Sequence, residues 1–318
     1  MSTVTAEATP TPIVPPSPAT TPAQPKPLTG TPAQLASSEE IKNAVKKITT
    51  IATLPEVVAK IVTTVEDPKS SAAQLHKIVS HDPALVTRIL KVVNSAFYGL
   101  PGQIGPIERA IVLLGLNAVK NIAVAASLGQ LFRGVKLCEG YTAKDLWTHC
   151  IAVAVASRDL SRSLKLPVSD EAFLAGMIHD VGMLISMQLY PEKLREACEL
   201  AKSNNVPFVV AERHLMGMDH QQLGQTLCEI WKFPKSCQIV AGNHHGHALP
   251  GDVHRQILSI VHVTDTFVCA TANTGFPLTA ASQTLDSKAL SDLGIDPVAV
   301  ERTKARMPEL LSAASTLL

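Results

Sequence analysis

The chain has 318 residues, 46% of them hydrophobic, which is enough to bury a sizeable core in one or two domains. Its 28 Lys and Arg residues against 27 Asp and Glu give a formal net charge of +1, which excludes a general electrostatic attraction to nucleic acid or anionic lipid. Continuous apolar runs fall short of the roughly 18 residues that span a bilayer, and the N-terminus lacks a basic and apolar secretion signal, so we expect a cytoplasmic protein.

The cysteine pattern agrees with a reducing compartment. No pair is spaced as CxxC, and several cysteines fall on apolar helical stripes, where they are typical of small core residues. We therefore expect no disulfide bonds.

The N-terminal segment has a composition unlike the rest of the chain. Residues 1–32 hold nine of the 22 prolines, and Thr and Ala make up much of the remainder. Such a segment buries too little apolar surface to offset its ordering entropy. We predict a disordered tail over residues 1–35 that acts as a tether.

From about residue 36 the pattern becomes helical. In "DPALVTRILKVVNSAFYG", Asp82 is placed as a helix cap and Pro83 in the first turn, ahead of apolar residues at helical spacing. Capping also explains the adjacent pair His81-Asp82 without a metal. Further helices are predicted at "IERAIVLLG", at "NAVKNIAVAASLGQLF" with Asn117 as its cap, and at "TAKDLWTHCIAVAVASRDLSRSL". Because alternating strand patterns are nearly absent and only "VPFVVAE" is ambiguous, the predicted fold class is all-α, with many short helices.

Several ionisable side chains fall on the apolar faces of these helices. His179 and Asp180 stand side by side in the apolar run "AFLAGMIHDVGML", which predicts that both project from one helix into a shared cleft. A buried carboxylate on such a face must be paired, hydrogen-bonded or metal-bound. Seven histidines and aspartates on five helical segments share this character: His149, His179, Asp180, His220, His244, His245 and Asp265.

Each of these residues alone has a structural explanation. A single histidine on an apolar face is more often a hydrogen-bonded core residue than a ligand, and an aspartate at a helix start is usually a cap. Together, imidazoles and carboxylates suit one or two divalent ions such as iron, manganese or zinc, with Asp180 able to bridge two ions. No two cysteines stand among them at CxxC spacing, which argues against a structural thiolate zinc site. The other histidines are interpreted as surface or core residues: His76, His81, His214, His247, His254 and His262.

The order of an isolated histidine, the pair "HD" and a later aspartate resembles the H…HD…D signature of the HD phosphohydrolase superfamily. The upstream stretch "LPEVVAKIVTTVEDPKSSAAQLHKIVSHDPALVTRILKVVNSAFYG", with "IERAIVLLGLNAVKNIAV" and "HQQLGQTLCEIWKFP", resembles the HDOD family over about residues 40–250. The resemblance implies an HDOD domain over about 36–275, with an N-terminal helical subdomain at about 40–135, an HD-like helical core at about 140–275 and further helices at 276–318 that pack on it. It also implies a bacterial, cytoplasmic regulatory setting, often beside cyclic-di-GMP or phosphorelay components.

The same resemblance implies that the seven residues match metal ligands of the related HD-GYP phosphodiesterases. Two departures weigh against that activity. His245 is followed by "GHALPGDV", with no GYP segment, and Gly182 is followed by Met183 where the enzymes favour a lysine. We therefore expect no hydrolysis of cyclic-di-GMP and no cyclic-dinucleotide partner.

Two hypotheses follow for function. One is a non-catalytic signalling module that acts by binding a signalling protein, with its ligand-like residues holding a metal or a hydrogen-bonded core. The other is a metal-dependent phosphohydrolase of a phosphate ester or nucleotide, with Asp180 as its central catalytic and metal-binding residue. Nucleic-acid binding is a weaker third, because "KNAVKK" is short and aromatic content is only 4%. No membrane association is expected.

Overall fold

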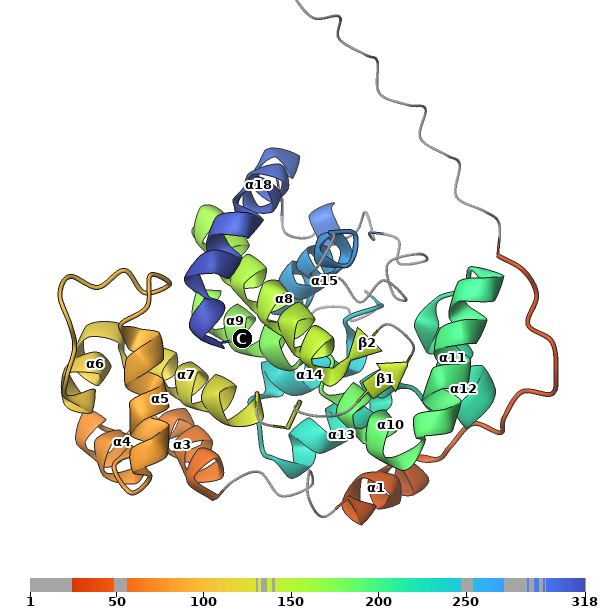
Figure 1. The fold of residues 1–318 in the computed structure, drawn as a ribbon, viewed down its shortest axis with the longest axis horizontal. Helices are drawn as coiled ribbons and strands as arrows, with labels where there is room; N and C mark the ends of the chain where they lie inside the picture. The colour runs from red at the N-terminus through yellow and green to blue at the C-terminus, as the bar shows by residue number, and fades with distance from the viewer. Residues whose placement is uncertain are drawn as a thin grey trace, which may run out of the picture.

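The structure, a computed structural model, describes residues 25–48, 56–129, 131–132, 136–138, 141–246, 254–271, 285, 289–291, 294 and 296–317. Its described part is built from α-helices, as the sequence predicts (Figure 1). The two short strands β1 (Lys136–Cys138) and β2 (Tyr141–Thr142) pair antiparallel just before the longest helix. The fold is therefore all-α with one minor hairpin.

Residues 25–36 do not form part of a free tail. They run beside α11 (Pro191–Asn204) and α12 (Phe208–Met216), where the backbone N–H of Lys26 donates to the carbonyl of Asn204 and that of Ala33 to His214, both at 2.8 Å. The predicted disordered tail therefore ends earlier than residue 35, because backbone hydrogen bonds offset the ordering of this segment. The rest of that prediction, residues 1–24, lies outside the described residues. Helix α1 (Ser38–Lys47) follows, and Ser37 forms its capping box.

An N-terminal lobe contains α3 (Glu56–Glu66), α4 (Ala72–Val79), α5 (Pro83–Val93), α6 (Ile107–Leu114) and α7 (Leu116–Leu128). The prediction for α5 is confirmed, since the Asp82 side chain accepts from the backbone N–H of Leu85 at 2.9 Å. The prediction that Asn117 caps α7 is wrong. Gly115, at φ +85°, makes the turn after α6, so the next helix begins at Leu116 and Asn117 lies in its first turn.

The HD-like half surrounds α8 (Ala143–Ser163), whose buried face runs along most of its length. Around it lie α9 (Ser169–Ile178), α15 (Arg255–Cys269) and the C-terminal α18 (Pro297–Ala313). Helices α10 (Gly182–Leu189), α11, α12, α13 (His220–Ile230) and α14 (Lys235–Asn243) complete this half (Figure 1). The ambiguous "VPFVVAE" begins α12, which starts directly after Pro207.

The chain's end is tied to α8. The indole N–H of Trp147 donates to the carbonyl of Leu317 at 2.8 Å, within the short 3₁₀ turn η1 (Ser315–Leu317). Thr303 on α18 donates to the buried carboxylate of Asp159 at 3.0 Å. The last helix therefore packs on the core.

Two further expectations concern the core. The cysteines whose side chains the structure describes are all buried, and no disulfide joins any two of them: Cys150, Cys198, Cys228, Cys237 and Cys269. One described stretch, Ser169–Leu189, has the length and hydropathy of a membrane span, but 89% of it is buried inside the protein. Burial of this extent is typical of a core segment.

Candidate metal centre

The seven residues singled out in the sequence meet at one place in the HD-like half. His149 comes from the first third of α8, and Asp265 comes from α15. His220 is the first residue of α13, which Asp219 caps, and His244 and His245 follow the end of α14 directly. Four packed helical segments and one turn thus deliver these side chains to a common point.

The pair His179-Asp180 departs from the prediction that it lies within one helix. Helix α9 ends at Ile178, and Asp180 lies in the turn before α10 begins at Gly182. Close packing explains the break, because a Cβ on Gly182 would lie 1.9 Å from the carbonyl oxygen of His220. This close approach places the turn against α13, with the Asp180 carboxylate beside the histidines of the cluster.

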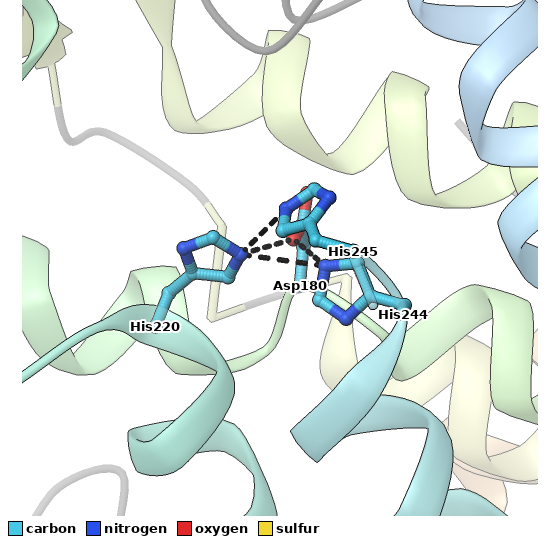
Figure 2. Close-up of side chains that lie close together, drawn as sticks. All are labelled: Asp180, His220, His244 and His245. Atoms are coloured by element: carbon cyan, nitrogen blue, oxygen red, sulfur yellow. Dashed lines mark hydrogen bonds and ion pairs between the residues drawn. The ribbon is translucent and has the colours of Figure 1, made fainter. Parts of the chain in front are cut away.

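One carboxylate oxygen of Asp180 faces three histidines (Figure 2). Its Oδ1 lies 3.2 Å from Nε2 of His244 and 3.5 Å from Nε2 of His220. Nε2 of His220 is also 3.0 Å from Nε2 of His245. These nitrogens converge on one small space beside Asp180.

The other oxygen faces a second group. Asp180 Oδ2 lies 3.3 Å from Nε2 of His179 and 3.6 Å from Nε2 of His149. Asp265 Oδ1 is 3.1 Å from the same nitrogen of His149. The atoms of His149, His179 and Asp265 could hold a metal ion of their own, so Asp180 stands between two candidate ion positions.

In three histidines, a hydrogen bond at Nδ1 determines that Nε2 is the ring nitrogen that faces the cluster. Nδ1 of His179 donates to the carbonyl of Gly176 at 2.7 Å, and Nδ1 of His244 donates to that of Val240 at 3.2 Å. Nδ1 of His220 lies 2.5 Å from a carboxylate oxygen of Glu212. Because each Nδ1 has an acceptor, this network assigns the proton there and leaves the Nε2 lone pair for a cation.

Glu212 is the residue of the site that the sequence did not reveal. It lies on α12, is fully buried, and also accepts from the backbone N–H of His220 at 3.3 Å. Carboxylate–histidine pairs of this kind orient metal-binding imidazoles. The stretch "VVAERHLM" shows an ordinary glutamate on a helix, so only the packing of α12 on α13 identifies it.

The electrostatics of the cluster are strongly coupled. Burial opposes charge on Asp180, but the neighbouring His179 outweighs it and holds the pKa of the carboxyl well below its usual range. Burial likewise opposes protonation of His179 and His220, yet Asp180 and Glu212 raise the pKa of each to about 9. Burial lowers the pKa of His244 and His245, which favours neutral imidazoles. The metal-free cluster thus combines ionised carboxylates with protonated His179 and His220 and neutral His244 and His245, and a cation would bind with release of the protons on the first two.

The donors fit divalent first-row metals. Asp180 Oδ1 is buried and accepts no hydrogen bond from the described residues, although two imidazole nitrogens lie within 3.5 Å of it. An ionised oxygen buried in this way is costly unless a cation or a donor satisfies it. Imidazole and carboxylate ligands without thiolate match zinc, iron or manganese. A divalent ion beside Asp180 would satisfy this oxygen.

The other histidines lie off the cluster, as expected. His76 is 3.0 Å from Glu108, and His214 lies 3.2 Å from the carbonyl of Thr29. His262 is buried behind the cluster, where its Nδ1 donates to the carbonyl of His244 at 2.8 Å. His81 and His254 lie at helix starts, and His247 is outside the described residues.

A scan against family models matches the HDOD domain over residues 51–247. The chain belongs to the HDOD domain family. A curated relative, an uncharacterized protein of Treponema pallidum (strain Nichols), is 23% identical over 216 residues, which make up 68% of this chain and 41% of the relative. The aligned part of this HDOD protein therefore spans about two fifths of that relative.

Solved structures share the fold. An HDOD domain protein of unknown function from Geobacter sulfurreducens superposes with a TM-score of 0.71 and 19% identity, covering 89% of this chain and 99% of that one. A candidate signal transduction protein from Marinobacter aquaeolei VT8 gives 0.70 and 20%, covering 88% and 65%. A candidate phosphohydrolase from Shewanella amazonensis SB2B gives 0.66 and 21%, covering 87% and 98%. At these identities, the likeness establishes the HD-like fold alone.

Proposed function

We propose that this HDOD protein is a regulatory signalling module whose HD-like half binds two divalent metal ions. The observation that carries the metal site is the position of Asp180, whose two carboxylate oxygens face two separate groups of ligand atoms. In the proposed site, His220, His244 and His245 hold one ion, and His149, His179 and Asp265 hold the other. Asp180 bridges them.

Burial of the cluster favours a regulatory role over turnover. The Asp180 side chain is 5% exposed, and His245, at 11%, is the most exposed of the seven. No lysine or arginine of the described chain pairs with any of these seven residues, and Met183 occupies the position where the related enzymes favour a lysine. A phosphate group would have little room to enter the cluster, and no described lysine or arginine would neutralise its negative charge there.

A second function, metal-dependent phosphohydrolysis, is supported by the position of Asp180 between the two groups of ligand atoms. Metal ions held on both sides of one carboxylate would supply a polarised water and Lewis-acid contact for a phosphate ester. The chain's own contribution would be orientation, with Glu212 fixing His220 and Asp180 holding both groups together. The substrate would be a phosphate ester or nucleotide.

Metal content and turnover separate the two functions. The protein is purified without oxygen and without a metal-binding tag, its metals are counted, and phosphomonoesters, nucleotides and cyclic dinucleotides are offered with Mn²⁺ or Fe²⁺. We expect near two ions per chain and no turnover. Metal-dependent turnover that Asp180→Asn abolishes would replace the regulatory function by the hydrolytic one, and metal-free protein under all conditions would refute the metal site.

A matched control is Asp159→Asn. Asp159 is also a buried carboxylate of this half, but it pairs with Thr303 and Arg306 instead of the cluster. We expect Asp159→Asn to keep its metal and Asp180→Asn to fall below about a tenth of an ion per chain, since every ligand group meets Asp180.

The regulatory output is proposed to be a contact with another signalling protein in the cytoplasm of a bacterium. This rests on the family, together with the balanced charge, which gives no general attraction to nucleic acid or membrane. Pull-down with the metal-loaded protein, compared with Asp180→Asn, tests it. Loss of the captured partner in the variant would tie the output to the metal cluster.

A further inference from the structure

A polar cavity lies between the N-terminal lobe and the HD-like half, apart from the metal cluster. Its volume is about 260 Å³, and its walls come from the end of α3, the first half of α7 and the starts of α9 and α14. Lys120 and Asn121 of α7 line it and are buried. Buried polar side chains around a cavity are unusual unless something satisfies them.

Asn121 provides an acceptor that is not satisfied. It is 2% exposed, and its Nδ2 donates to the carbonyl of Asp170 at 2.7 Å. Its Oδ1 is buried and accepts no hydrogen bond from the described part of the chain. Since leaving such an atom unpaired costs stability, Oδ1 is suited to an N–H donor brought by a ligand.

Donors lie on the same cavity. Lys120 is 4% exposed and gives one N–H to Glu66 at 2.6 Å, out of the three that an ammonium carries. Helix α14 begins beside it with Pro234 as N-cap, and no described side chain caps its first N–H groups. An ammonium beside an uncapped helix start attracts an anionic group.

The remaining wall is acidic. Asp170 and Glu171, in the first turn of α9, line the cavity, and Glu171 is exposed and makes no described ion pair. The thiol of Cys237 is not reactive, because burial raises its pKa to about 12. The cavity therefore offers carboxylates and the Asn121 oxygen as acceptors and the Lys120 ammonium, which also pairs with Glu66, as a donor, a set suited to a ligand that carries both charges.

The cavity shares two helices with the metal cluster. Helix α9 has Asp170 and Glu171 in its first turn and His179 at its end, and α14 begins at the cavity and ends at His244. The two helices also pack on each other. Each has about ten residues, or roughly 15 Å at 1.5 Å per residue, so a displacement at one end would reach the other.

We propose that this cavity binds a small zwitterion of the α-amino-acid class. The ligand's ammonium would donate to Asn121 Oδ1 and Glu171, and its carboxylate would accept from Lys120 and the first N–H groups of α14. As an extension that rests on the proposed metal function, this ligand is an effector that changes metal affinity through α9 and α14.

Calorimetry on the full chain tests the binding without metal, in the presence of EDTA. The twenty standard L-amino acids are the probes, with propionate and propylamine as single-charge controls. We expect at least one amino acid to bind and neither control to match it. If propionate or propylamine bound as tightly as the best amino acid, the proposal that the ligand is a zwitterion would be wrong. If no probe bound at up to millimolar concentration, the proposed site itself would be wrong.

Variants locate the binding. Lys120→Met and Glu171→Gln are expected to weaken it about tenfold or more, since each removes a charged partner. Lys60→Met is the matched control, because Lys60 also pairs with a glutamate of the same lobe, Glu56, but outside the cavity. Glu171 is exposed, so its variant keeps the fold even if Lys120→Met does not. Unchanged affinity in Glu171→Gln would remove the proposed site.

The effector role has its own readout. Mn²⁺ affinity is measured with and without the amino acid that binds, and a change of about threefold or more is expected. Amino-acid binding with unchanged Mn²⁺ affinity would overturn the effector role and leave the cavity site standing. Absence of Mn²⁺ binding altogether would refute the metal function instead, without touching the result obtained in EDTA.

Discussion

The two halves of the molecule use burial differently. Among the described residues of the N-terminal lobe, 56–128, the buried polar side chains are confined to α7: Lys120, Asn121 and Ser127. The HD-like half gathers seven histidines and aspartates at a single point, all of them buried except the partly buried His245, with Glu212 behind them. Apolar burial stabilises without needing partners, whereas each buried charge needs one. The N-terminal lobe therefore fits a scaffold, and the HD-like half fits a binding site.

The largest stability effect is expected in the N-terminal lobe. Ile61 on α3 is fully buried, so Ile61→Ala leaves a cavity and should lower the free energy of unfolding by about 2–5 kcal/mol. Urea titration measures this change. Metal content at low temperature should stay at the wild-type value. Loss of metal in the folded variant would show that packing in the N-terminal lobe also determines metal binding in the HD-like half.

Within the cluster, single ligands should separate the two ion positions. His149→Ala removes a nitrogen that belongs to one group, and His245→Ala removes one that belongs to the other. Each variant is expected to retain about one ion per chain, since Asp180 and the remaining ligands of the opposite group stay. Elemental analysis of both variants counts the ions. If either lost both ions, the groups would form one indivisible site.

Glu212→Gln should act more weakly than loss of a ligand. The glutamine keeps the size of the side chain but removes the charge beside Nδ1 of His220, and outer partners of this kind typically change metal affinity about 10–100-fold. Competition with a fluorescent chelator measures the change. The matched control is Glu229→Gln on α13, whose carboxylate contacts Gln225 and not the cluster. Equal affinities in the two variants would remove Glu212 from the site.

The smallest effect is on the pH dependence of the metal-free protein. The pKa of His179 and of His220 is about 9 in the folded chain, above the ordinary 6.5, so their stabilising contribution is full below about pH 6.5. It is lost as pH rises through 9, and the melting temperature in EDTA should fall over that range. In Asp180→Asn the fall should be shallower, because the carboxylate that raises the pKa of His179 is gone. Parallel curves for the two proteins would contradict this assignment.

Local sequence patterns predicted most helices and failed where packing sets a boundary. The capping position of Asp82 and the stripe that follows it were sufficient to place α5. The start of α7 was misplaced because Gly115, and not Asn117, governs that turn. The pair His179-Asp180 was placed in a continuous helix because nothing local shows that Gly182 must approach the backbone of His220. Residues 25–35 were predicted to belong to the tail because their hydrogen-bond partners lie about 180 positions later in the chain.

What the sequence determined by itself is the all-α class and the seven candidate residues, because helical period and residue chemistry are local properties. Only the tertiary structure decided that Asp180 divides those residues into two groups and that Glu212 supports His220. It alone also joined Lys120, Asn121 and the start of α14 around one cavity. These relations depend on how distant helices pack, which no spacing along the chain encodes.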